Sequence, residues 1–485
     1  MRVKPRTYPE LERELRAIVG DEYVLTSIVD LSVYESDGET LDTAIPDIVV
    51  LPASTEETRA VIMACHRAGV SFTPRGAGTG LSGGATTIYG GVSLVLTRLT
   101  KILSIDPINF VAHVEVGVPN LSVSRAAAKH NLYFAPDPSS QVASTIGGNI
   151  AENAGGAHTL KYGLTTNNVL GVKVILPDGR VTTFGGPARE SFGLDLLGLF
   201  LGSEGTLGIA TEAWLRLIPR AQSVETMLAF FPSVESGGQA VSDIVAAGVI
   251  PAAMEMLDQL TLRCVEESLH MGLNTEAGAL LIVELDGPRA GIEVHRQEVE
   301  KCAQANQCIS ITWAKDEKER AQIWKARKTS FGAMGRLAPH GYVLDGVIPR
   351  SRLREAIERI QKTSDKYKIV IANVYHAGDG NLHPCLLYNR DNEDEVRRVL
   401  LGAKEILEMC VELGGTLSGE HGIGIEKLLE MSIAFDEPTL ASMNWVRDAF
   451  NAQQLLNPGK LIPSPKSCGE SGGRALLRHQ LSASC

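Results

Sequence analysis

The chain has 485 residues, of which 44% are hydrophobic and 21% are charged, and this length predicts two or three domains rather than a single core. A formal net charge of −11 argues against sequence-independent binding to nucleic acid. No apolar run approaches the roughly 20 residues that a membrane-spanning helix needs, and the N-terminal Met-Arg-Val-Lys-Pro-Arg lacks an apolar signal core. We therefore expect a cytoplasmic protein without a transmembrane segment, which meets a membrane only through partner subunits.

The first 220 residues mix helices and strands without the strict alternation of a doubly wound sheet. A helix is expected over 8–20, where Leu11, Leu15 and Ile18 fall on one face, and a second helix runs from the N-cap Ser54 to His66. We also expect strands at 45–51, 70–73 and 92–96, two hairpins formed by 102–105 with 111–116 and by 172–176 with 181–184, and a third helix at 120–130.

The character of the sequence changes after Pro219, where long amphipathic segments alternate with strands. A second α+β domain is expected over 221–415, with helices at 234–247, 258–271, 291–307, 316–335, 351–366 and 393–413 and strands at 226–231, 279–285, 308–313, 342–348 and 369–375. Residues 416–463 form a C-terminal segment with a helix at 438–451, and the Ser/Gly-rich stretch 464–485 is expected to be a disordered tail.

The glycines are concentrated in a few loops instead of being spread along the chain. The densest loop, Pro74-Arg-Gly-Ala-Gly-Thr-Gly-Leu-Ser-Gly-Gly84, contains Gly-x-Gly-x-x-Gly, but it leads into a strand, whereas a Rossmann fingerprint leads into a helix. Its consecutive main-chain N–H groups suit a diphosphate without a helix dipole. The alternative, a bare flexible turn, does not explain five glycines within nine residues between two strands.

Two further loops of small residues follow, at 135–156 and 201–209. Together the three loops offer main-chain surfaces with few bulky side chains. Such surfaces fit an extended cofactor that is contacted mainly by backbone.

The stretch His376-Ala-Gly-Asp-Gly-Asn-Leu-His383-Pro is followed 37 residues later by Gly-Glu420-His421-Gly-Ile-Gly. The Asp-Gly-Asn sequence predicts a tight reversal between two strands, which lets both imidazoles converge on one face. Glu420 could add an oxygen ligand, and two His with one carboxylate is a common set for a catalytic divalent metal. His421 would then remain as a base. The alternative is that all four are loop residues with ordinary hydrogen bonds.

None of the eight cysteines forms Cys-x-x-Cys, so the sequence lacks a zinc-ribbon or iron–sulfur signature. Buried reduced thiols are the expected state. If the protein transfers electrons, it has no iron–sulfur relay of its own.

These motifs in combination resemble the flavin-binding proteins of the vanillyl-alcohol oxidase/p-cresol methylhydroxylase superfamily. Within it they resemble the FAD-dependent D-2-hydroxyacid dehydrogenases, most closely the bacterial glycolate oxidase and D-lactate dehydrogenase flavoproteins. The resemblance covers about 20–463 and includes Ala-Pro-Asp-Pro-Ser-Ser, Gly-Ser-Glu-Gly-Thr-Leu-Gly and Leu-Asn-Pro-Gly-Lys. It implies an α+β fold in which 1–220 and the C-terminal segment form a two-part FAD domain, while 221–415 form the substrate cap.

The resemblance also implies roles for individual residues. Those expected to contact FAD are Pro74, Arg75, Gly76, Ala77, Gly78, Thr79, Gly80, Ser82, Pro138, Ser139, Thr145, Gly148, Asn149, Glu204, Ile209 and Asn457. His376, His383 and Glu420 match the family's metal ligands, and zinc is expected from the ligand types, with manganese or iron as alternatives. His421 matches the general base, Asn381 a polar substrate contact, and Arg327 the arginine that binds the substrate carboxylate.

The function implied is FAD-dependent oxidation of a small D-2-hydroxyacid, glycolate or D-lactate, with hydride transfer to flavin N5. The resemblance further implies a second flavoprotein-like subunit and an iron–sulfur subunit as electron-transfer partners. Three alternatives stay open: a D-2-hydroxyglutarate dehydrogenase, a non-catalytic flavoprotein subunit of an electron-transfer complex, and a metallohydrolase. The last leaves the three glycine loops unexplained.

Overall fold

The computed structural model describes residues 5–188 and 193–463, so the expected disordered tail at 464–485 lies outside the described residues. The chain divides into two compact units. Unit 1 comprises Met1–Gly155, Leu164–Arg220 and Glu420–Cys485, and unit 2 comprises Gly156–Gly163 and Ala221–Gly419. Segment 156–163, which falls inside the expected first domain, therefore belongs to unit 2. Among the described residues, no helix combines the length and the apolar character needed to cross a membrane.

Unit 1 contains two sheets. The elements of its first sheet and the helices around it are α1 (Pro9–Val19), β1 (Val24–Leu25), α2 (Ile28–Ser32), β2 (Ile48–Val50), α3 (Thr55–Ala68), β3 (Phe72–Arg75) and β4 (Val92–Val95). The strand order is β1-β2-β4-β3, and β4 runs parallel to both β2 and β3. The densest glycine loop joins β3 to β4, so the expected strand–loop–strand arrangement is confirmed.

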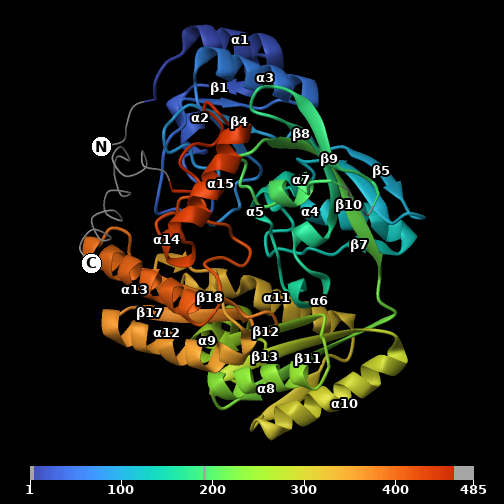
Figure 1. The fold of residues 1–485 in the computed structure, drawn as a ribbon. Helices are drawn as coiled ribbons and strands as arrows, with labels where there is room; N and C mark the ends of the chain where they lie inside the picture. The colour runs from blue at the N-terminus through green and yellow to red at the C-terminus, as the bar shows by residue number, and fades with distance from the viewer. Residues whose placement is uncertain (1–4, 189–192, 464–485) are drawn as a thin grey trace. The chain divides into compact units, whose positions relative to one another are not determined.

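The second sheet of unit 1 is antiparallel and has the order β5-β6-β10-β8-β9, with β7 paired to β10. Its elements are β5 (Ile102–Asp106), β6 (Val111–Glu115), α4 (Asn120–Ala127), β7 (Leu132–Phe134), α5 (Ile146–Glu152), β8 (Val169–Ile175), β9 (Val181–Gly185), α7 (Leu196–Phe200) and β10 (Ile209–Pro219). The long strand β10, visible in green in Figure 1, has no counterpart among the expected elements.

The expected loop 135–156 contains a short helix, α5. Thr145 caps it, because its Oγ1 accepts a hydrogen bond from the N–H of Gly148 over 3.3 Å. The helix was not expected from the sequence because two of its seven residues are glycine, which has a low helix propensity. The Thr145 cap and the burial of Ile146 and Ile150 stabilise it.

The C-terminal segment of unit 1 carries α14 (Met431–Ala434) and α15 (Glu437–Phe450). Beyond α15 the chain pairs with β3. Phe72 donates its N–H to the carbonyl of Leu455, and Asn457 donates its N–H to the carbonyl of Phe72. The end of the described chain is thus hydrogen-bonded to the strand that precedes the glycine loop.

Unit 2 is one antiparallel sheet between two layers of helices. The sheet order is β14-β11-β13-β12-β17-β18-β15, with β16 paired to β18. The strands are β11 (Ser223–Phe231), β12 (Ala253–Asp258), β13 (Ala279–Gly287), β14 (Ser310–Trp313), β15 (His340–Val343), β16 (Gly346–Val347), β17 (Val370–His376) and β18 (Asn381–Tyr388). Strand β12 is not among the expected elements, whereas the hairpin of β17 and β18 is confirmed.

The helices of unit 2 are α6 (Thr159–Tyr162), α8 (Val234–Ala246), α9 (Gln259–Leu269), α10 (Arg289–Ala305), α11 (Glu317–Met334), α12 (Leu353–Tyr367) and α13 (Glu393–Glu412). Figure 1 shows α8, α10 and α12 along one face of the sheet and α11 on the opposite face. Apolar side chains of α9 and α11, including Leu262, Val265 and Ile323, pack against Leu257 and Ile282 of the sheet. Arg327 of α11 and His376 of β17, which are discussed below, meet on this side of the sheet.

Candidate functional site

The glycine loop of unit 1 allows a close approach of backbone and has unsatisfied polar groups. Gly78 has a φ of +70° and lies against the guanidinium of Arg75, so any side chain there would clash. Arg75 is 8% exposed, its Nη1 has no hydrogen-bond partner among the described residues, and burial lowers its pKa. The hydroxyl of Ser82 is also buried and unsatisfied. A buried cation and a free hydroxyl beside exposed main chain fit a diphosphate.

The residues of the second loop that the resemblance assigns to the flavin side lie near this glycine loop. A Cβ on Gly76 would clash with Oγ1 of Thr145, which shows that Gly76 touches the start of α5. Asn149 is 3% exposed, and its Oδ1 accepts a hydrogen bond from Asn120 over 3.2 Å. Unit 1 therefore brings together residues of the first two loops, and these fit a cofactor held mainly by main chain. Pro138 and Ser139 lie in the loop that precedes α5.

Glu204 of the third loop is buried and makes hydrogen bonds to the C-terminal segment. It accepts hydrogen bonds from the N–H groups of Ile423 and Gly424 over 2.6 and 2.7 Å. Ile209, later in the same loop, begins β10. Burial raises the pKa of Glu204, although these two N–H groups act in the opposite direction. The carboxylate thus anchors the loop that follows Glu420 and His421.

Two residues that support this loop were not identified from the sequence. Lys427 is fully buried and donates to the carbonyl of Gly422 over 2.9 Å. Glu152 is half-buried, its Oε2 is buried beside Gly422, and desolvation, followed by the charges of Glu204 and Asp37, raises its pKa well above the usual value. The only sign in the sequence that Lys427 and Glu152 have a structural role is that each is a charged residue among mostly apolar or small ones.

In unit 2, His376 and His383 come together as the expected reversal predicts. His376 pairs with Asn381 and Val374 pairs with His383 across β17 and β18, so both imidazoles lie on one face of the hairpin. The ring centroids are 4.9 Å apart, and a ring nitrogen of each residue lies within 4.8 Å of the other. This spacing allows both rings to bind one ion.

Each of these two histidines contacts a buried carboxylate. Nδ1 of His376 lies 2.7 Å from Oε1 of Glu255, and Nε2 of His383 lies 3.3 Å from Oδ1 of Asp345. Both acids are fully buried. A carboxylate behind each imidazole fixes the tautomer and the ring orientation, as is usual for metal-binding histidines. The donor set therefore fits a divalent metal.

Arg327 projects from α11 toward the same site. Its Nε is 2.5 Å from Oε2 of Glu255, and its Nη2 is 3.5 Å from Nδ1 of His376. Asn381, which pairs with His376, has a buried Oδ1 without a partner in the described part of the chain. An arginine and an unsatisfied amide beside a pair of histidines suit a small polar anion.

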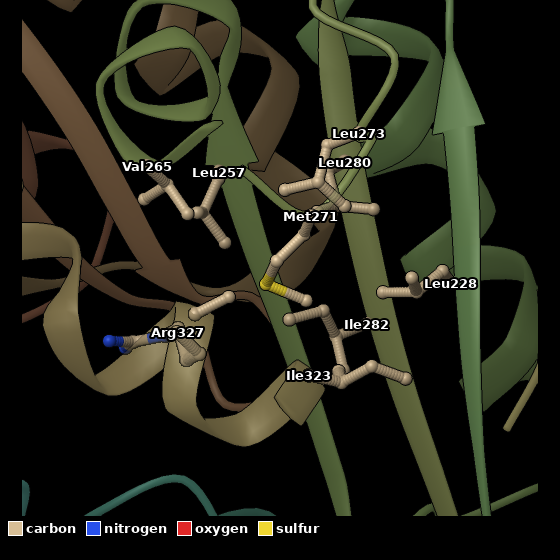
Figure 2. A pocket seen from close by; sticks show the side chains of 10 residues that line it. Leu228, Leu257, Val265, Met271, Leu273, Leu280, Ile282, Ile323 and Arg327 are labelled. Carbon is tan, nitrogen blue, oxygen red and sulfur yellow. The ribbon is translucent and has the colours of Figure 1, made fainter. Parts of the chain in front are cut away.

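The stem of Arg327 reaches this position across an apolar pocket. The lining includes Leu257 and Ile282 from the sheet, Ile323 from α11, and Met271 from the loop after α9. Figure 2 shows the nitrogen atoms of Arg327 at the end away from Met271 and Ile282. The pocket holds the aliphatic part of the side chain and offers no polar contact of its own.

Glu420 and His421 are the first residues of unit 1 after Gly419, the last residue of unit 2. Gly419 itself is fixed within unit 2. Its N–H lies 3.0 Å from Oδ2 of Asp345, and it packs so closely on Asn381 that a Cβ would lie 2.5 Å from Nδ2 of that residue. The residue immediately before Glu420 is thus held by Asp345, the carboxylate that contacts His383.

Comparison with known proteins identifies the family. Residues 46–185 match the family model described as "FAD binding domain", and residues 220–461 match "FAD linked oxidases, C-terminal domain". The chain is 44% identical over 458 residues to glycolate oxidase subunit GlcD of Escherichia coli (strain K12), which covers 94% of this chain and 92% of that protein. It is 33% identical over 417 residues to a D-lactate dehydrogenase of Archaeoglobus fulgidus, which covers 86% and 91%.

The fold is also similar to solved structures. The structure of p-cresol methylhydroxylase with substrate bound superposes with a TM-score of 0.76 at 16% identity and covers 93% of this chain and 96% of that one. This confirms the expected α+β fold of the vanillyl-alcohol oxidase/p-cresol methylhydroxylase type. The glycine loops, the two family models and the full-length relatives agree, and the chain belongs to the FAD-linked oxidases, a family of flavin-dependent oxidoreductases.

Proposed function

We propose that this protein oxidises glycolate or D-lactate with FAD, assisted by a divalent metal. The observation that carries the proposal is the buried group of His376, His383 and Arg327 on one face of unit 2, in which both imidazoles are oriented by carboxylates. A 2-hydroxyacid offers a carboxylate for the arginine and two oxygens for a metal. The names of the full-length relatives, a glycolate oxidase subunit and D-lactate dehydrogenases, give the same substrate class.

The proposed cofactors have separate roles. FAD would supply the hydride acceptor, and a divalent metal held by this site would supply a Lewis acid for the substrate oxygens. Residues Pro74–Gly80 with Ser82, the α5 region with Thr145, Gly148 and Asn149, and Glu204, Ile209 and Asn457 would hold FAD in unit 1. His376, His383 and Glu420 would hold the metal, with zinc favoured by the two imidazoles and manganese or iron as alternatives.

The assignment of Glu420 as the third ligand rests on its place in the chain. Gly419 is held by Asp345, which also contacts His383, and Glu420 is the next residue. Consecutive Cα atoms are about 3.8 Å apart, so the backbone of Glu420 begins one residue after a glycine that is held by the carboxylate in contact with His383.

The protein's own side chains then orient the substrate and move its proton. Arg327 binds the carboxylate, because its planar fork matches the two oxygens of that anion. Asn381 supplies a polar contact to the bound acid. His421, in its neutral form, accepts the hydroxyl proton as the α-carbon is oxidised.

Electron transfer beyond the flavin requires another protein or a small acceptor, since the chain has no cysteine cluster. We propose that partner subunits, one flavoprotein-like and one with iron–sulfur clusters, take the electrons. The word "subunit" in the name of the Escherichia coli relative supports an assembly of this kind.

The function is tested by dye-linked oxidation across a panel of short D-2-hydroxyacids, with the purified protein checked for flavin absorbance and bound metal. We expect turnover of glycolate or D-lactate, slow peroxide formation in air, and no activity in apo-protein. A protein that contains flavin but oxidises no 2-hydroxyacid would instead support the non-catalytic alternative.

A further inference from the structure

We infer that Glu255 is the positioning residue of this site, with one carboxylate oxygen orienting the metal ligand His376 and the other orienting the substrate-binding Arg327. The inference rests on the proposed function and adds a residue that the sequence motifs do not contain. Glu255 lies on β12. It is 121 residues before His376 and 72 residues before Arg327 in the chain.

The two contacts use different atoms of one carboxylate. Oε1 lies 2.7 Å from Nδ1 of His376, and Oε2 lies 2.5 Å from Nε of Arg327. Glu255 is fully buried, and Arg327 is 3% exposed. A buried carboxylate retains its charge when it is paired and hydrogen-bonded, and Arg327 supplies that pairing.

The contact with His376 fixes the tautomer of the imidazole. A carboxylate can only accept a hydrogen bond, so Nδ1 of His376 must carry the proton. That tautomer has its lone pair on Nε2, the atom required for a metal bond. Glu255 therefore selects the form of His376 that can act as a ligand.

Glu255 contacts Arg327 at Nε. Nη2 of Arg327 lies 3.5 Å from Nδ1 of His376, but a protonated Nδ1 cannot accept from it, so both terminal nitrogens are left for a substrate. Glu255 takes the Nε end, and the apolar pocket of Figure 2 holds the stem. An arginine fixed at both places loses less conformational freedom on binding a carboxylate than a mobile one does. The same acid thus prepares the metal ligand and the anion-binding group.

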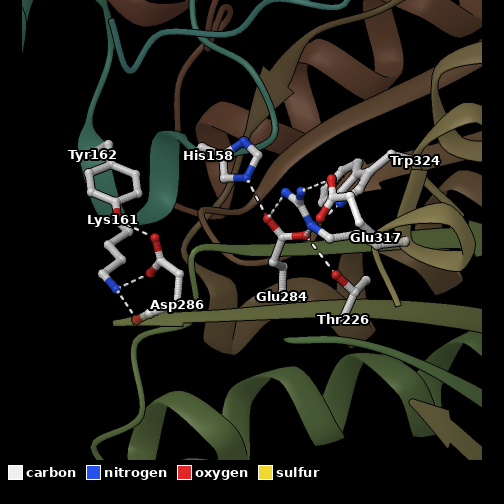
Figure 3. A network of polar contacts seen from close by, with 9 residues as sticks. His158, Lys161, Tyr162, Thr226, Glu284, Asp286, Glu317 and Trp324 are labelled. Carbon is white, nitrogen blue, oxygen red and sulfur yellow. Dashed lines mark hydrogen bonds and ion pairs between the residues drawn. The ribbon is translucent and has the colours of Figure 1, made fainter. Parts of the chain in front are cut away.

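Glu284 provides a matched control on the same face of the sheet. It is 2% exposed, it ion-pairs with Arg320 of the same helix α11 over 2.9 Å, and it accepts from Trp324 and His158 (Figure 3). None of these contacts includes His376, His383 or Arg327. Loss of its charge should affect folding without affecting the site.

The test compares Glu255→Gln and Glu284→Gln in the full-length, flavin-loaded protein. Glutamine has one acceptor oxygen, so its amide N–H₂ must face either the proton on Nδ1 of His376 or the guanidinium. Metal-stripped protein is titrated with Zn²⁺ against a chromophoric chelator, and KM for the 2-hydroxyacid is measured at saturating Zn²⁺. We expect Glu255→Gln to bind Zn²⁺ about 10- to 100-fold more weakly, to show a KM about tenfold higher, or both.

Glu255→Asp serves if the glutamine variant does not fold. It keeps both acceptors, but it is one methylene shorter and cannot reach both partners, so the same two quantities should change by a smaller factor. Wild-type Zn²⁺ affinity and KM in the Glu255 variants would overturn this inference alone, as would a change in both quantities in Glu284→Gln. Absence of Zn²⁺ binding and of turnover in the wild-type protein would overturn the proposed function, and this inference with it.

Discussion

The side-chain amide of Asn457 donates to the main-chain oxygen of Glu204 over 2.7 Å, although the two residues are 253 positions apart in the chain. The same amide reaches the carbonyl of Gly84, and the fully buried Lys460 donates to Gly84 and Thr86. The end of the described chain therefore stabilises the far side of the glycine loop. The loop has little freedom to move, so a side chain added to it must compete directly with the cofactor.

The glycines of this loop differ in what a side chain would meet, which separates cofactor loss from misfolding. A Cβ on Gly80 would meet no protein atom closer than 3.7 Å, whereas Gly78 has a φ of +70° and lies against Arg75. We expect Gly80→Val to fold with near wild-type stability but to lose FAD, because its side chain would occupy the surface offered to the diphosphate. Flavin absorbance per protein and a thermal unfolding curve check this.

Gly78→Val is the control. We expect it to lose flavin and also about 1–3 kcal/mol of unfolding free energy, because its backbone would be strained. Stoichiometric flavin with a normal spectrum in Gly80→Val would show that the diphosphate does not bind at this loop.

The parts of the site that could be predicted from the sequence are those that local chemistry determines. The Asp-Gly-Asn reversal sets the register of β17 and β18, and the register alone places His376 and His383 on one face. The glycine loop is predictable in the same way, since five glycines within nine residues between two strands have few structural explanations.

Glu255 could not be predicted because its role depends on which strand lies beside β17. Strand β12 is a short apolar run, and nothing local specifies that Glu255 will pair with His376 in the sheet. A charged residue inside an apolar run was the available signal, and it marks burial without naming a partner. Strand β10 was missed for a related reason, because its pairing with both β6 and β8 is set by tertiary packing.

Glu284 should contribute to stability in a pH-dependent way. Burial alone would raise its pKa, but hydrogen bonds from His158 and Arg320 outweigh burial and hold the pKa well below the usual value (Figure 3). A depressed pKa means that this stabilisation is present above the unfolded pKa of 4.5 and is lost as the pH falls toward the folded pKa. We expect Glu284→Gln to cost roughly 3 kcal/mol at pH 7, near the lower end for breaking a buried pair.

The difference between wild type and Glu284→Gln should narrow below pH 4.5, by up to about 1.4 kcal/mol for each pH unit. Urea unfolding at pH 7 and pH 4 measures this difference. The fluorescence of Trp313 and Trp324 reports unit 2 once Trp214 and Trp445 of unit 1 have been replaced by Phe. A difference that does not depend on pH would show that Glu284 stabilises unit 2 through packing and not through its charge.

Substrate size should be limited by the acid beside His383. A second carboxylate on the substrate needs a cation, and the segment Gly341–Pro349 offers Asp345, which is fully buried and contacts His383, Ser418 and Gly419. We expect kcat/KM for D-2-hydroxyglutarate to be at least about tenfold below that for D-lactate or glycolate, because like charges repel and an unpaired buried charge is costly. The reverse ranking in the same dye-linked assay would favour the hydroxyglutarate alternative.

The proposed base and the proposed metal ligands should respond differently to removal. His376→Ala, His383→Ala and Glu420→Ala should each lose metal and turnover yet keep flavin, because the loops proposed to bind FAD belong to unit 1 and contain none of these side chains. His421→Ala should keep both metal and flavin and lose roughly 10²- to 10⁴-fold in kcat, the range for a general acid–base group.

The pH dependence gives a second measure of the same assignment. An imidazole accepts a proton only when it is neutral, so wild-type kcat should fall on the acidic side of its pH profile, and the His421→Ala variant should lack that limb. Elemental analysis of the four variants decides the ligand set. Metal loss in His421→Ala would make that residue a ligand and leave the proposed proton transfer without its base.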